Sequence, residues 1–164
     1  MAIVNKLNKK DNRAFGMIEI LIVIFLIVVG ILSVSSLAAT ILKISNLNGQ
    51  TTQANNLAIE AIEAVRTIRD GTDWFVDGLG IVNIGAIYRV QKTTDAPPQW
   101  QFALGQETIG GFTRQVILSR VFRDQSTGNI AESGIEDQKT RKITVTVSWA
   151  DKSVLLATYL SDWK

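Results

Sequence analysis

The sequence contains no cysteine and no histidine among its 164 residues. Without cysteine, the chain has no disulfide, no thiolate nucleophile and no cysteine-based zinc site. Without histidine, it lacks the commonest general base and the favoured metal ligand, and a Ser-His-Asp arrangement is excluded. We therefore expect a protein that is not an enzyme, with no catalytic residue, no cofactor and no bound metal.

The net positive charge is concentrated before residue 15, and the charges after it nearly cancel. Residues 1–14 have a net charge of +3, whereas the rest of the chain has a net charge of −1. The basic residues of this leader are Lys6, Lys9, Lys10 and Arg13, and the acidic one is Asp11. The basic excess therefore does not indicate a nucleic-acid-binding face, which would be a basic stripe on a folded domain.

The leader is followed by a long apolar stretch. From Ile20 to Leu42 there are 23 residues without a charge. As a helix they would reach about 35 Å, which is enough to cross a bilayer's hydrocarbon core. Lys43 ends the stretch on the far side. Basic residues that flank a membrane span favour its cytoplasmic side. We therefore expect a single-pass cell-membrane protein with a cytoplasmic N-terminus and an extracytoplasmic remainder.

One acidic residue, Glu19, lies at the start of this stretch. A carboxylate in hydrocarbon costs about 2.5–3.5 kcal/mol, so it needs a partner or a place among the headgroups. A secretory signal peptide cleaved near Ser36-Leu37-Ala38 is one interpretation. A plain single-pass anchor is another, but neither of them explains the acid.

Residues 6–42 resemble the N-terminal signal of type IV prepilins and type II secretion pseudopilins. That signal is a basic leader, a small residue, an aromatic or Met, three mostly apolar residues, a Glu and an unbroken apolar helix. Ala14 takes the small position, Phe15 becomes the first mature residue and Glu19 the fifth. The resemblance implies that a prepilin peptidase cuts between Ala14 and Phe15 and methylates the new amine. The family usually has Gly before the cut, and cleavage after Gly16 is the alternative register.

The resemblance also implies an assembly role for Glu19. In a filament the N-terminal helices pack in an apolar core, where an unpaired carboxylate is strongly penalised. The free amine of Phe15 on a neighbouring subunit can neutralise Glu19, and a buried ion pair can specify register even where it adds little stability. The expected partners are copies of the chain or sibling pilins, the prepilin peptidase, the inner-membrane assembly platform and, before assembly, membrane lipid.

The periodicity beyond the apolar stretch predicts an amphipathic helix and then a sheet. Apolar residues recur every three or four positions at Ala54, Leu57, Ala58, Ala61, Ile62, Val65 and Ile68. Asp70-Gly71 signals the end of the helix, and Asn48-Gly49 is a plausible kink. The expected strands are 81–90, 100–104, 112–122, 141–149 and 153–160, and the expected loops are 97–98, 123–140 and a short hairpin at 150–152.

The expected fold is α+β and type IV pilin-like, with a long N-terminal helix packed on a C-terminal antiparallel sheet of four to five strands. The expected organisation is a removed leader at 1–14, a transmembrane and assembly half of the helix at 15–42, an amphipathic half at 43–70 and a β-rich extracytoplasmic head at 71–164.

Other residue clusters suggest weaker sites. Asp70, Asp73 and Asp77, and the loop after Asp124, do not match a calcium-loop spacing and favour solvated turns. Of four tryptophans, Trp149 is expected in the core. A basic patch of Arg114, Arg120 and Arg123 would make DNA contact possible, although a solvated sheet face is the simpler interpretation.

The sequence therefore predicts a minor-pilin-like structural subunit of a type IV pilus-like filament, displayed at the cell surface after assembly. The alternatives are a pseudopilin of a type II secretion or DNA-uptake system, and a membrane-anchored extracytoplasmic binding domain that does not polymerise.

Overall fold

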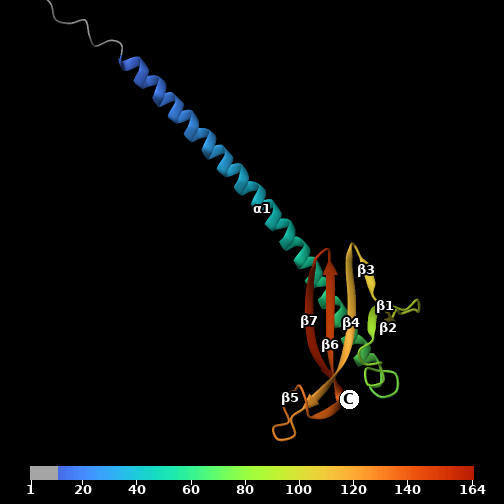
Figure 1. The fold of residues 1–164 in the computed structure, drawn as a ribbon. Helices are drawn as coiled ribbons and strands as arrows, with labels where there is room; N and C mark the ends of the chain where they lie inside the picture. Colours follow the sequence, from blue (N-terminus) through green and yellow to red (C-terminus); the bar gives the residue numbers. More distant parts are fainter. Residues whose placement is uncertain (1–10) are drawn as a thin grey trace, which may run out of the picture. The chain divides into compact units, whose positions relative to one another are not determined.

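The computed structural model describes residues 11–164, with side chains from Gly16 onward (Figure 1). Helix α1 (Asp11–Gly71) is followed by seven strands. The chain divides into two compact units between Asn48 and Gly49, although helical hydrogen bonding continues through that position. We call residues 49–164 the head. The C-terminal part of α1 therefore belongs to the same unit as the sheet.

The sheet is antiparallel, and five strands form its main path. The strands are β1 (Ile87–Lys92), β2 (Trp100–Leu104), β3 (Glu107–Ile109), β4 (Phe112–Arg123), β5 (Ile130–Ala131), β6 (Ile135–Trp149) and β7 (Lys152–Ser161). The order is β2-β1-β4-β6-β7, with the short strands β3 and β5 paired to β4. The expected α+β fold is confirmed, and the two short strands bring the total to seven.

The core of the head lies between the sheet and the C-terminal part of α1, which Figure 1 shows behind the long strands. The predicted apolar helix face is confirmed, because Ala54, Ala58, Ala61 and Val65 are all completely buried. Alternation on β4 and β6 supplies the facing layer, whose members are Val116, Leu118, Ile143, Val145 and Val147. Three alanines on the helix let its backbone approach these branched side chains closely. The predicted core position of Trp149 is also confirmed.

Two strand boundaries differ from the sequence prediction. The expected strand over 81–90 begins only at Ile87, because Gly85 adopts a φ of 79° and donates its N–H to the Leu118 carbonyl as the chain enters the sheet. The expected loop over 123–140 is shorter, because β6 begins at Ile135. Residue 135 pairs with Arg123 after an irregularity in β4 that shifts the register.

Candidate functional sites in the helix and in the head

The N-terminal part of α1 exposes a continuous apolar surface. Every side chain from residue 17 to residue 46 is exposed, and α1 contains a stretch long and apolar enough to cross a membrane. Four hydroxyls in this part donate to helix carbonyls three or four residues earlier, and they belong to Ser33, Ser35, Ser36 and Thr40. Because these side chains satisfy their donors within the helix, they do not require water.

Glu19 is exposed on this apolar part of α1. Among the described side chains it has no ion-pair partner, and the next charged residue toward the C-terminus is Lys43. An unpaired carboxylate on an apolar surface is costly once that surface is buried in lipid or in protein. Glu19 is therefore the one charged position in residues 16–42, and burial would be costly there without a partner.

The proposed cleavage and methylation positions fall at the edge of the structure. Ala14 and Phe15 lie within the backbone of α1, but their side chains are outside the described residues. Most of the predicted leader, residues 1–10, is also outside the described part of the chain. The cut between Ala14 and Phe15 stays a prediction from the sequence.

The predicted basic patch of three arginines is wrong. Arg114 is buried in the head and contacts Glu60 and Glu107, whereas Arg120 is exposed. The two are an even number of residues apart and pair with β6 in one continuous register, but burial alternates only as far as Leu118. Arg120 is exposed where the regular pairing ends, next to the register irregularity between Arg120 and Phe122. Arg120 contacts Glu136, and Arg123 contacts Asp137 at 2.6 Å. Each arginine therefore has a carboxylate partner.

Asp137 lies near the start of β6 and accepts hydrogen bonds from residues of β4 and β6. Partial burial acts to raise its pKa, but hydrogen bonds from the Arg123 guanidinium, the Thr140 hydroxyl and the Lys139 N–H outweigh it and lower the pKa. Nearby Arg141 is buried, and its Nη2 donates to the Gly80 carbonyl at 3.3 Å. The Arg141–Gly80 contact joins the sheet to the loop that follows α1, whereas the contacts of Asp137 lie within the sheet.

The two acidic clusters form turns. Asp73 accepts hydrogen bonds from the N–H groups of Phe75 and Val76, and Asp77 accepts one from the N–H of Asp73. Asp70 lies apart, with its pKa lowered by hydrogen bonds from Arg69 and then Trp163. Within residues 11–164, no group of three acidic side chains is arranged to hold a metal ion.

The Asp124 loop is closed by hydrogen bonds to a single carboxylate oxygen. Oδ1 accepts from the hydroxyl and N–H of Ser126 and from those of Thr127. These bonds lower the pKa of Asp124 to about 2, with the Ser126 hydroxyl contributing most. The carboxylate therefore acts as a turn cap.

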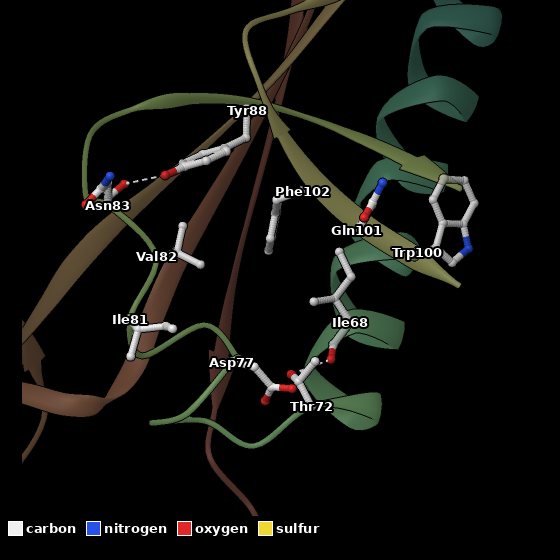
Figure 2. A pocket seen from close by; sticks show the side chains of 10 residues that line it. All are labelled: Ile68, Thr72, Asp77, Ile81, Val82, Asn83, Tyr88, Trp100, Gln101 and Phe102. Atoms are coloured by element: carbon white, nitrogen blue, oxygen red, sulfur yellow. Dashed lines mark hydrogen bonds between the residues drawn. The ribbon is translucent and has the colours of Figure 1, made fainter. Parts of the chain in front are cut away.

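A pocket of about 380 Å³ opens in the head and was not predicted from the sequence (Figure 2). The end of α1, the loop before β1, and strands β1 and β2 line it. Its apolar lining residues are Ile68, Ile81, Val82, Tyr88, Trp100 and Phe102. Its polar lining residues are Thr72, Asp77, Asn83 and Gln101. Trp100 and Phe102 alternate on one strand, but that spacing alone does not distinguish a pocket from a core.

No protein-family model, no curated protein and no solved structure matches this chain. The sites are therefore interpreted from their own geometry.

Proposed function

We propose that this chain is a type IV pilin-like subunit that is cut between Ala14 and Phe15 and polymerises through the N-terminal part of α1. The proposal extends to its partners, which are other copies or sibling pilins, a prepilin peptidase and an inner-membrane assembly platform. In it the head lies outside the cytoplasm, first on the membrane and then on a cell-surface filament.

The observation that supports this proposal most is the exposed apolar surface of residues 17–46 with a single carboxylate on it. Lipid alone would cover the apolar side chains, because their hydroxyl neighbours are satisfied within the helix. If the helix moves into a protein interior, lipid supplies no opposite charge for Glu19. A second subunit offers both an apolar surface and, after cleavage, a free amine.

The compact head supports the same proposal. Its core is formed entirely by residues 54–160, so the head does not require the N-terminal part of α1 for its packing. The exposed apolar helix is thereby available for lipid and then for neighbouring helices. In the proposed assembly, the Phe15 amine of one subunit pairs with Glu19 of the next and fixes the register between the two helices.

Intact-mass measurement of the protein from native membranes or sheared filaments tests the processing step. We expect the loss of residues 1–14 and one added methyl group on Phe15. A chain that begins at Met1 would contradict the proposal and indicate a plain anchor. A chain cut after Ala38 would contradict it as well and indicate a secretory signal.

Substitution of Glu19 tests the assembly step. Removing one partner of a buried ion pair costs about 3–5 kcal/mol, so Glu19→Ala should lower incorporation into filaments by more than about tenfold while the protein stays in the membrane. Ser33→Ala is the matched control, because Ser33 is on the same exposed helix but donates only to its own backbone. Normal assembly of Glu19→Ala would refute the proposed pairing.

A further inference from the structure

We propose that the head pocket binds one neutral hexose ring of a carbohydrate. The proposal concerns only the head and does not depend on whether the chain polymerises. It rests on three features of the pocket, which are its aromatic wall, its mixture of hydrogen-bond donors and acceptors, and the sign of its charge.

The aromatic wall offers flat apolar surfaces. The rings of Tyr88 and Phe102 are 5.5 Å apart between centroids and tilted by 59°. Tyr88 is buried and supports the wall from the core, so the rings open to a ligand are those of half-buried Phe102 and Trp100. In Figure 2 the Phe102 ring lies between Val82, on the loop, and Ile68, on the helix. The C–H face of a pyranose ring is apolar with a partial positive charge, which suits the negative face of an aromatic ring. A pocket of about 380 Å³ is in the size range that holds small ligands.

The polar side chains of the pocket keep unused hydrogen-bonding capacity. Asp77 accepts the N–H of Asp73 through Oδ1 at 2.8 Å, which leaves Oδ2 without a partner among the described residues. The Thr72 hydroxyl donates to the Ile68 carbonyl at 2.7 Å and keeps its lone pairs. The Asn83 side-chain amide has no partner within residues 16–164, so it supplies both a donor and an acceptor. Adjacent hydroxyls of a sugar, each a donor and an acceptor, match this set.

The charge of the pocket favours a neutral ligand. Asp77 is the only charged lining residue among those described, so an anionic ligand such as a phosphate or an acidic sugar would be repelled. A cationic ligand is disfavoured in turn, because Lys92 places its Nζ 5.2 Å from the centroid of the Trp100 ring. A neutral polyhydroxylated ring can form hydrogen bonds with the polar groups of the pocket and is repelled neither by Asp77 nor by Lys92.

The test uses the full chain in lipid nanodiscs, which avoids sugar-headed detergents. The probes are the methyl glycosides of glucose, galactose, mannose and N-acetylglucosamine, with methyl glucuronide and choline chloride as charged comparisons. Binding is measured by saturation-transfer NMR and by tryptophan fluorescence. The variants are Asp77→Asn and Asn83→Ala, both at exposed positions. The matched control is Asn56→Ala, exposed on α1 away from the pocket lining.

We expect at least one neutral glycoside to bind saturably in the millimolar range and more tightly than either charged probe. Loss of a hydrogen bond to a charged group should weaken that binding by about tenfold in Asp77→Asn, and loss of a neutral hydrogen bond should weaken it by about two- to tenfold in Asn83→Ala. Binding should be unchanged in Asn56→Ala. Absence of binding by all four neutral glycosides would overturn the proposal. Preferred binding of choline, or equal binding by the pocket variants and the control, would overturn it as well. None of these outcomes affects the processing and assembly tests of Glu19.

Discussion

Replacing Arg114 is the most direct test of how the helix and the sheet are joined in the head. The Arg114 side chain is only 2% exposed. Its Nε and Nη2 lie 2.7 Å and 2.6 Å from Glu107 Oε1, and its Nη1 donates to the Leu57 carbonyl at 2.8 Å. A longer contact of 3.3 Å reaches Glu60. One guanidinium on β4 therefore binds both β3 and α1.

The expected cost follows from what each partner loses. Breaking a buried ion pair by removing one member costs about 3–5 kcal/mol. When Arg114 is replaced, Glu60 can be solvated because its side chain is half exposed. Glu107 is only 21% exposed and loses its ion-pair partner, and the Leu57 carbonyl loses its hydrogen-bond donor. We therefore expect Arg114→Met to lower the free energy of unfolding of the head by about 3 kcal/mol, at the lower end of that range. The midpoint temperature should fall by roughly 10 °C.

The measurement is denaturant and thermal unfolding of the full chain in nanodiscs, followed by tryptophan fluorescence. All four tryptophans of the sequence lie in the head, so the signal reports the head alone. Arg66→Met is the control, because the Arg66–Glu63 pair is exposed on the same helix and should contribute less than about 0.5 kcal/mol. If Arg114→Met costs no more than Arg66→Met, the guanidinium does not hold the helix to the sheet.

Two further predictions concern turns of the head. Ala150 adopts a left-handed φ of 46° in the β6–β7 turn, which glycine adopts more readily. Ala150→Gly should therefore raise the free energy of unfolding by about 0.5–1 kcal/mol in the same assay. An unchanged or lower free energy of unfolding would contradict this. NMR titration should give Asp124 a pKa of about 2 instead of 3.8. Since the folded pKa is depressed, the ionised Asp124 contributes its full stabilisation of the turn above pH 3.8, and this is lost as the pH falls toward 2. The protection of the Ser126 and Thr127 amides, relative to their intrinsic exchange rates, should therefore fall over that range. Titration of Asp124 near 3.8 would refute the capping role.

Local periodicity was sufficient to predict α1 and the long strands β4, β6 and β7, but not the short strands β3 and β5. The apolar spacing of Ala54, Ala58, Ala61 and Val65 identified the buried face of α1, because residues three or four apart share one side of any helix. Strict alternation from Ile143 onward identified β6 and its inward face. Both patterns repeat within a few residues, so they can be interpreted before any tertiary contact is known.

The ends of elements were harder to predict, because pairing between strands determines them. Residues 135–140 have no clear alternation, yet they form strand because Arg123 and Phe122 pair with Ile135 and Glu136 across the irregularity in β4. Arg120 is exposed at the last regular pair before this irregularity, whereas Arg114 lies well inside the regular pairing and is buried. A one-residue shift in register reverses the face on which each later side chain lies.

The sequence by itself determined that this chain has one long helix whose apolar stretch carries a single acid, Glu19, and an α+β head without histidine or cysteine chemistry. Only the tertiary structure decided that Arg114 is a buried link to Glu107 and that Phe102 and Asp77 line one pocket. The physical reason is distance along the chain. Hydrophobic periodicity depends on near neighbours, whereas ion pairs and pockets depend on which distant segments the packed sheet and helix bring together.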